Sequence, residues 1–269
     1  MKRKNCIIIS LILLVIVIGN LVGCSNEAAT DEDSFEELKA RGEIIMGLDD
    51  TFAPMGFRDD EGELVGFDVD LAEEVFSRTD FEVKLQPIDW TMKEAELNSG
   101  NIDLIWNGYS ITDERKEKVA FTQPYLENRQ VVVTLLDSEI DSKADLEGKK
   151  VAVQSESSAL EAVNSEPEVV ATFDGGEPVL FDTYQEAMMD LEAGRVDAVV
   201  GDEVLIRYYI KQKGSDVYKV IGEDFGEEEY GIGVRKSDKK LLELLNNILD
   251  EMREDGTYDE IYERWFEGE

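Results

Sequence analysis

A polar segment at positions 107–115, Asn-Gly-Tyr-Ser-Ile-Thr-Asp-Glu-Arg, combines residue types that could bind a carboxylate. It follows the apolar run 102–106, so it stands where a buried strand should end and where ligands commonly meet α/β folds. Gly108 permits close approach of the backbone, and Ser110 offers a hydroxyl group. Arg115 offers a planar guanidinium that can make two parallel hydrogen bonds to a carboxylate.

The same segment has a purely structural interpretation. Thr112 is a suitable N-cap residue, and Asp113 and Glu114 would follow it in the acidic first turn of a helix. Taken alone, the segment therefore predicts either a ligand loop or an ordinary capped helix.

A repeated pattern supplies a second polar position. Residues 97–105 (Leu-Asn-Ser-Gly-Asn-Ile-Asp-Leu-Ile) are matched by 191–199 (Leu-Glu-Ala-Gly-Arg-Val-Asp-Ala-Val). Each copy predicts a helix end, a glycine stop and a buried strand, which indicates two lobes of related design. The first strand leads to the loop of Ser110 and Arg115, and the second leads to Asp202. If both strands end at one cleft, Asp202 faces Arg115, a geometry that suits a zwitterion.

Two alternatives remain open for these positions. The match between the two segments could be accidental, since Gly-x-Val-Asp is a common helix-to-strand connection, and Asp202 could serve to cap the next helix. A similar choice concerns 154–158 (Gln-Ser-Glu-Ser-Ser), where Gln154, Ser157 and Ser158 stand between a short strand and a helix. Free N–H groups and hydroxyls at a helix start favour an anion, but they also serve simple capping.

The elements that must position these residues alternate along the chain. Short apolar runs at 44–48, 81–85, 102–106, 131–136 and 151–153 predict strands, and segments with helical period separate them. Asp68 is a candidate cap for the helix that carries Leu71 and Val75. The pattern predicts an α/β fold.

Composition excludes several functions. The 269 residues contain 27 Lys and Arg against 62 Asp and Glu, so the formal charge is −35 and nucleic acid is not expected as a partner. Histidine is absent, which excludes Ser-His-Asp and Cys-His catalysis and disfavours zinc. A calcium loop centred on Gly62 fails, because Phe57 stands where its first acidic ligand should be. We expect neither a metal ion nor a cofactor.

The N-terminus predicts export. Lys2, Arg3 and Lys4 precede an apolar run at 7–18, the order of charge and hydrophobicity in a secretory signal peptide. Leu-Val-Gly precedes Cys24, an ending that resembles a bacterial lipoprotein signal. We therefore expect residues 1–23 to be removed. Cys24 would then carry acyl chains that hold the protein at the membrane. The alternative is an uncleaved membrane anchor. The polar, acidic residues 24–34 predict a flexible tether.

Four longer motifs, in this order, resemble one family. They are Gly-Phe-Asp-Val-Asp-Leu-Ala at 66–72, Ser-Ile-Thr-Asp-Glu-Arg at 110–115, Phe-Thr-Gln-Pro-Tyr at 121–125 and Asp-Gly-Thr-Tyr at 255–258. The chain resembles the polar amino-acid solute-binding proteins of ABC importers over nearly all of its expected mature length. The resemblance implies a type 2 periplasmic-binding fold, an α/β fold of two lobes joined by two hinge crossings, here near 125–129 and 227–230. Lobe 1 would comprise 35–126 and 231–269, and lobe 2 would comprise 127–230.

The resemblance also implies roles for single residues. Arg115 would grip the α-carboxylate of an amino acid with help from Ser110, Ser157 and Ser158. Asp202 would take the α-ammonium, together with the Gly108 carbonyl and the Ser110 hydroxyl.

Side-chain recognition would fall to Asp49, Phe52, Trp90 and Gln154. The two aromatic residues could enclose a flat or cationic group. Glu156 stands where a glycine is common in the family, and Gln154 stands where some glutamine binders have lysine. These departures favour arginine or lysine as ligand, with glutamine or cystine as alternatives. It stays open whether Glu156 and Trp106 line the pocket.

The sequence therefore predicts a binding protein on the outer face of the cytoplasmic membrane. It would act as a monomer, bind a free polar amino acid and deliver it to ABC permease subunits. The rival is an enzyme on the same fold, such as a dehydratase or hydrolase that uses Glu156 or Asp49 as an acid or base.

Overall fold

The computed structural model describes residues 32–214 and 216–267. The expected signal peptide at 1–23, Cys24 and the tether as far as residue 31 lie outside the described residues. Within the described part of the chain, no helix is both long enough and apolar enough to cross a bilayer.

Lobe 1 is built on a five-stranded sheet whose strands come from both ends of the chain. The strand order is β5 (Glu82–Pro87), β1 (Glu43–Leu48), β6 (Leu104–Ile105), β13 (Gly233–Val234) and β7 (Ala120–Phe121). Strands β5, β1 and β6 are parallel, whereas β13 runs antiparallel to both of its neighbours. A separate small sheet follows β1, formed by β2 (Thr51–Phe52), β3 (Gly56–Arg58) and β4 (Leu64–Val65).

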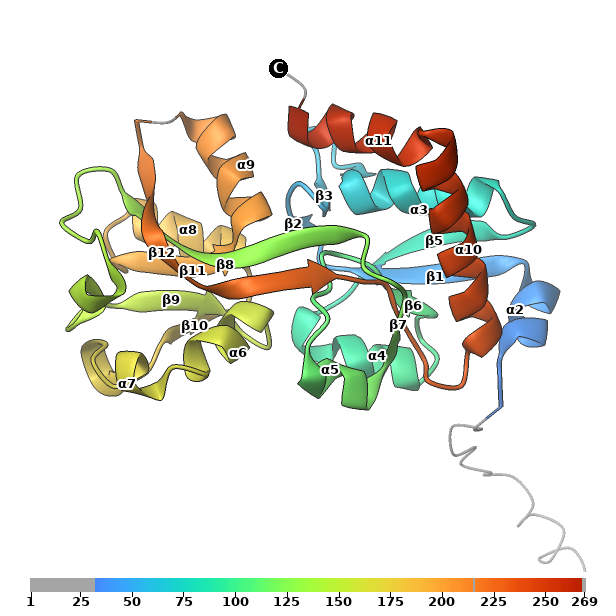
Figure 1. Cartoon of the computed structure of the whole chain (residues 1–269), viewed down its shortest axis with the longest axis horizontal. Coiled ribbons are helices and arrows are strands. Elements are labelled where there is room, and N and C mark those ends of the chain that lie inside the picture. Colours follow the sequence, from blue (N-terminus) through green and yellow to red (C-terminus); the bar gives the residue numbers. More distant parts are fainter. Residues whose placement is uncertain (1–31, 215, 268–269) are drawn as a thin grey trace, which may run out of the picture. The chain divides into compact units, whose positions relative to one another are not determined.

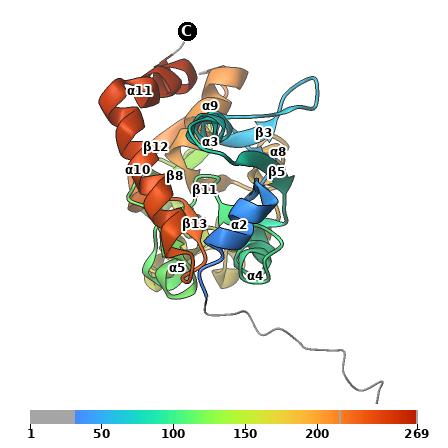
Figure 2. The same ribbon diagram turned by 90° about the vertical axis from the view of Figure 1, so that its right-hand side faces the viewer.

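Helices cover this first sheet. They are α2 (Phe35–Arg41), α3 (Phe67–Ser77), the 3-10 turn η1 (Trp90–Met92), α4 (Lys93–Asn98), α5 (Asp113–Lys118), α10 (Lys239–Asp255), α11 (Thr257–Tyr262) and the π-helical η4 (Glu263–Glu267). Helix α10 buries Leu241, Leu245 and Met252 at helical spacing. It packs with α11 against α3 (Figure 2).

Lobe 2 is built on a second five-stranded sheet. Its strand order is β10 (Val179–Phe181), β9 (Val151–Gln154), β11 (Ala198–Asp202), β8 (Leu126–Leu135) and β12 (Tyr218–Tyr230). The first three strands are parallel, and the last two pair antiparallel with their neighbours. The accompanying helices are η2 (Lys143–Leu146), α6 (Ser158–Asn164), α7 (Pro167–Val170), η3 (Asp174–Gly176), α8 (Tyr184–Glu192) and α9 (Glu203–Lys213).

Two antiparallel strands, β8 and β12, run side by side from lobe 2 to lobe 1 (Figure 1). The expected crossing points pair with each other: Leu126 is opposite Tyr230 and Arg129 is opposite Glu227. From there the chain continues into β7 on one side and β13 on the other, so both crossings join the two sheets at one place.

The repeated pattern marks equivalent places in the two lobes. In lobe 1, α4 ends before Gly100, which has a φ of 77°, and the chain enters β6; in lobe 2, α8 ends before Gly194, with a φ of 66°, and the chain enters β11. Both glycines donate to the leucine three residues earlier, over 3.1 and 3.0 Å. Each strand is the third of its sheet, so the pattern reports a shared helix-to-strand connection.

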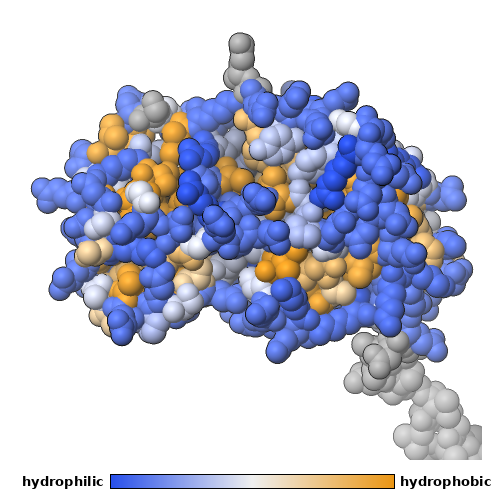
Figure 3. Space-filling model, viewed as in Figure 1, coloured by the Kyte–Doolittle hydropathy of each residue, from blue (hydrophilic) through white to orange (hydrophobic). Residues whose placement is uncertain are grey.

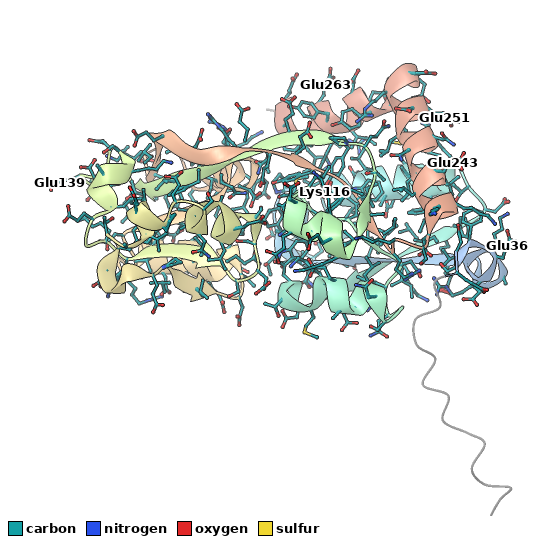
Figure 4. The ribbon with its side chains drawn as sticks, turned by 60° about the horizontal axis from the view of Figure 1, so that its bottom comes forward. Glu36, Lys116, Glu139, Glu243, Glu251 and Glu263 are labelled. Atoms are coloured by element: carbon teal, nitrogen blue, oxygen red, sulfur yellow. The ribbon has the colours of Figure 1, made fainter. Side chains whose placement is uncertain are left out.

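The surface is largely polar and acidic. Figure 3 shows apolar residues only in separate patches between hydrophilic ones on the face in view. Glu36, Glu139, Glu243 and Glu251, labelled in Figure 4, are exposed and point away from the body. The negative charge is thus carried outside, whereas the cores of the two sheets are apolar.

Candidate functional site

The loop after β6 presents Arg115 as the sequence predicts. Thr112 accepts a hydrogen bond from the Arg115 backbone N–H over 3.3 Å, so the predicted cap is confirmed. The Arg115 side chain is only 5% exposed and its guanidinium lies 4.6 Å from the centre of the Tyr109 ring. It donates to the Ser110 carbonyl at 3.1 Å and, across to lobe 2, to the Glu156 carbonyl at 3.2 Å. These two hydrogen bonds hold the guanidinium in place and use only part of its N–H donors, so it is suited to bind an anion.

Asp68 holds the backbone of this loop. Its Oδ2 atom accepts from the Gly108 N–H at 2.6 Å and from the Tyr125 hydroxyl at 2.9 Å. The prediction that Asp68 caps α3 is wrong, because Gly66 occupies the N-cap position and Asp68 turns inward. Complete burial raises the pKa of Asp68 to about 7, against the lowering effect of the hydrogen bond from Gly108.

Asp202 ends β11 on the lobe 2 side, where it is 3% exposed. It stands at the N-cap position of α9, but its side chain makes no capping hydrogen bond, so the capping interpretation is wrong. Its Oδ1 atom instead accepts from the Asn128 amide at 2.8 Å, the Gln130 amide at 3.0 Å and the Tyr230 hydroxyl at 2.6 Å. Burial, and then the neighbouring Glu228 carboxylate, raise the pKa of Asp202 well above its usual range.

The segment 154–158 contributes both capping and contacts between the lobes. Ser157 caps α6 by accepting from the Leu160 N–H at 3.1 Å, as the structural interpretation predicts. Ser158 lies 2.9 Å from the hydroxyl of Ser110 in the other lobe. Gln154 donates to Asp49 in lobe 1 at 2.9 Å and to the Asp182 carbonyl at 3.0 Å.

Asp49, Phe52 and Trp90 form the lobe 1 wall. Asp49 accepts from the N–H and the hydroxyl of Thr51, at 2.9 and 2.6 Å, and burial raises its pKa. The Phe52 ring packs against Tyr184 of lobe 2 with 5.8 Å between centroids, and Trp90 packs edge-on against Tyr109 at 5.8 Å.

These side chains enclose one narrow cavity between the lobes, with a volume of about 10 Å³. Nine of the ten predicted ligand-binding residues line it, namely Asp49, Phe52, Trp90, Gly108, Arg115, Gln154, Ser157, Ser158 and Asp202. The tenth, Ser110, does not line the cavity and bonds with Ser158 and Glu228. Glu156 borders an adjoining outer cavity of about 400 Å³, and Trp106 is a fully buried core residue that packs against Tyr125.

The cavity also contains two residues that sequence reasoning missed, Asn107 and Tyr184. The Asn107 Nδ2 atom and the Tyr184 hydroxyl are buried and have no hydrogen-bond partner among the described residues. A signal for Tyr184 exists in the repeat: Tyr184 precedes Leu191 by the same spacing that separates Trp90 from Leu97. The repeat therefore places one aromatic residue in the cavity from each lobe.

Similarity to known proteins identifies the family of this chain. Residues 44–268 match the family model of bacterial extracellular solute-binding proteins, family 3. The chain belongs to this family. Relatives in the family include the L-cystine-binding protein TcyJ of Escherichia coli, which is 32% identical over 94% of this chain and 93% of its own length. The ABC transporter arginine-binding protein 1 of the same organism is 33% identical over 84% of this chain and 92% of its own.

Solved structures of family 3 proteins confirm the predicted fold. An ABC uptake transporter substrate-binding protein from Streptococcus pneumoniae, with bound histidine, superposes with a TM-score of 0.85 at 39% identity, over 89% of this chain and 98% of its own. The two-lobed type 2 periplasmic-binding fold is thus confirmed, and so is the class of function: this family 3 member is an amino-acid-binding protein of the ABC transporter type.

Proposed function

We propose that this protein is an exported, lipid-anchored receptor that binds a free polar amino acid, preferably a basic one, and delivers it to the permease subunits of an ABC importer. The observation that carries this proposal is the single cavity lined by Arg115 from lobe 1 and Asp202 from lobe 2. A fixed cation and an acid on opposite sides of a closed space match the two charges of an α-amino acid.

In this proposal the α-carboxylate takes the free donor positions of Arg115, supported by Ser157 and Ser158. The α-ammonium donates hydrogen bonds to the Asp202 carboxylate and to the Gly108 carbonyl. Each charge-assisted hydrogen bond contributes roughly 1.5–3 kcal/mol. Exclusion of water by the two lobes strengthens them.

The ligand side chain would extend toward Asp49, Phe52, Trp90 and Gln154. Asp49 offers an acceptor, Gln154 can both donate and accept, and the aromatic rings offer faces to a flat cationic group. This set favours arginine or lysine. Cystine, histidine and glutamine are the competing ligands, since relatives bind cystine and histidine and an arginine-binding ancestral relative also binds glutamine.

Isothermal titration with the polar amino acids tests the proposal. We expect saturable binding of at least one of them, with arginine or lysine tightest. Arg115→Ala and Asp202→Ala should each weaken binding of every amino acid roughly 100-fold or more, because each leaves one ligand charge without its partner. Two exposed positions, Lys116→Ala on α5 and Glu186→Ala on α8, are the control variants and should bind normally. Normal binding by Arg115→Ala would refute the zwitterion site.

We further propose that Cys24 carries the lipid anchor and that the protein acts as a monomer on the outer face of the membrane. The support is the signal-like order of the first 24 residues. Detergent phase separation of the expressed protein tests the anchor.

A further inference from the structure

A second carboxylate, Glu228, stands directly behind Asp202. It lies on β12, where side chains alternate between two faces. Glu228 and Tyr230 turn toward Asp202, whereas Glu227 and Glu229 are exposed. Glu228 is half-buried and does not line the ligand cavity; it borders a separate cavity that Arg129 and Glu203 also line.

The two acids share their hydrogen-bond donors. The Asn128 amide nitrogen lies 2.8 Å from Asp202 Oδ1 and 2.7 Å from Glu228 Oε1. The Gln130 amide nitrogen lies 3.0 Å from the same Asp202 oxygen and 2.8 Å from the same Glu228 oxygen. Two amide groups thus hold one oxygen of each acid side by side.

The remaining charged and titratable groups around Asp202 do not neutralise two negative charges. Tyr230 from β12 donates to Asp202, and Tyr184 from α8 lies close by with a pKa that burial, and then Asp202, raise well above its usual range. Arg115, from α5, is the cation of the cavity wall, but its donors point to Ser110 and Glu156. On the outer side of Glu228, Arg129 is held by Glu203, with which it makes two hydrogen bonds. A buried carboxyl group beside a second carboxylate, with no cation bonded to either of them among the described residues, favours its protonated form.

We propose that Asp202 and Glu228 together retain one proton in the ligand-free protein and release it to solvent when the ligand ammonium binds. The inference rests on the proposed function, because it needs the ammonium at Asp202. The balance is simple: the singly charged pair and the cationic ammonium give a doubly charged pair, the bound ammonium and one free proton. No bond other than that O–H bond is broken.

Glu228 also orients Ser110. A chain of hydrogen bonds leads from the Gln130 amide to the Ser158 hydroxyl at 3.2 Å, from Ser158 to Ser110 at 2.9 Å, and from Ser110 to Glu228 at 2.9 Å. With its own proton directed to Glu228, Ser110 accepts the hydrogen bond from Ser158, a residue that lines the ligand cavity. Glu228 is therefore a positioning residue for the ammonium end of the site.

The sign of the pH dependence follows from the released proton. The complex binds fewer protons than the free protein, so raising the pH favours binding until the pair is fully ionised. The association constant should rise by up to tenfold per pH unit below that point. Protonation of the pair thus competes with the ligand.

The test is titration with the tightest-binding amino acid of the panel in two buffers at the same pH, phosphate and Tris, whose ionisation enthalpies differ. The difference in observed heat gives the number of protons released. In such titrations repeated across the neutral pH range, we expect wild type to release a substantial fraction of one proton. Glu228→Gln keeps the acceptor for Ser110 but removes the charge, so its proton release should fall to less than half and its pH profile should flatten. Subtracting the variant from wild type cancels any proton exchanged by the ligand side chain.

Two controls make the outcomes distinct. Glu227→Gln, exposed on the neighbouring position of β12, should behave as wild type, and Glu228→Asp should restore part of the proton release. Equal proton release in wild type and Glu228→Gln, or none in wild type, would overturn this inference while leaving amino-acid binding intact. Failure of wild type to bind any amino acid would overturn the proposed function as well.

Discussion

Asp68 shows how a single buried carboxyl group fixes the ligand loop. Its partners, Gly108 and Tyr125, are 40 and 57 residues away along the chain. Local reasoning assigned Asp68 to the cap of its own helix, because an acid near a helix start normally serves there. Such distant partners leave no local trace in the sequence, so this role was beyond prediction.

Replacement of Asp68 should change how stability depends on pH. The folded protein raises the pKa of Asp68 from 3.8 to about 7, so the folded state holds this proton more tightly than the unfolded state does. The Asp68 contribution to the free energy of unfolding therefore falls by roughly 4 kcal/mol as pH rises from about 4 to 7. Asn cannot ionise and lacks this loss. In urea unfolding, Asp68→Asn should gain stability relative to wild type between pH 5 and pH 8, whereas Glu73→Gln on the same helix should not. An equal difference at both pH values would contradict this.

Residues whose side chains face the cavity were the most predictable. Arg115 comes shortly after one strand of the repeated pattern and Asp202 ends the other, and the expectation that both would face each other in one cleft agrees with the cavity that both residues line. Asn107 and Tyr184 were missed because an asparagine at a strand end and a tyrosine after a threonine cap both have ordinary structural explanations. Glu228 was missed for another reason: it acts from behind the cavity, through Asp202 and Ser110.

At the scale of elements, the turn after β6 depends on Gly108. Its φ of 56° favours glycine, and a Cβ atom there would lie 2.7 Å from Phe52 Cε1 and 3.2 Å from Tyr230 Cε2. Gly100, at the other end of the same connection, has a φ of 77° with nothing within 4 Å of its Cβ position. The two glycines share the backbone strain but differ in their surroundings.

Alanine at these two positions should separate strain from crowding. Both changes should lower stability by roughly 1–2 kcal/mol through the left-handed backbone. Only Gly108→Ala should also displace the aromatic wall and weaken amino-acid binding at least about tenfold, since misplaced contacts at the ligand lose charge-assisted bonds. Thermal unfolding and titration on both variants check this. Equal affinities would show that the Phe52 contact relaxes without consequence.

The hinge strand β12 could not be predicted from its local sequence. Its 13 residues include the run Gly-Glu-Asp-Phe-Gly-Glu-Glu-Glu, a composition that disfavours strands. The family resemblance implied a crossing near 227–230, but no local pattern predicted the strand. The strand forms because it pairs with β8 along most of its length, an interaction that overrides local preference.

At the scale of the whole molecule, the proposed lipid anchor at Cys24 can be tested directly. If Cys24 is acylated, the expressed wild type should partition into the detergent phase and Cys24→Ala should not, because two acyl chains give stable membrane attachment. Cys6 lies within the expected signal peptide, so Cys6→Ala is the matched control and should partition as wild type. Retention of Cys24→Ala in the detergent phase would support the uncleaved anchor instead.

The strand order of lobe 1 has a consequence for the order of folding. Strand β13 lies between β6 and β7 and is paired with both. In the chain, β13 comes after all the strands of lobe 2. Val234 therefore pairs with Leu104 although the whole of lobe 2 lies between them in the sequence. A chain that emerges from an export channel N-terminus first can therefore complete the sheet of lobe 2 before that of lobe 1. Lobe 1 begins first along the chain, yet its sheet lacks its fourth strand until Gly233 and Val234 are available.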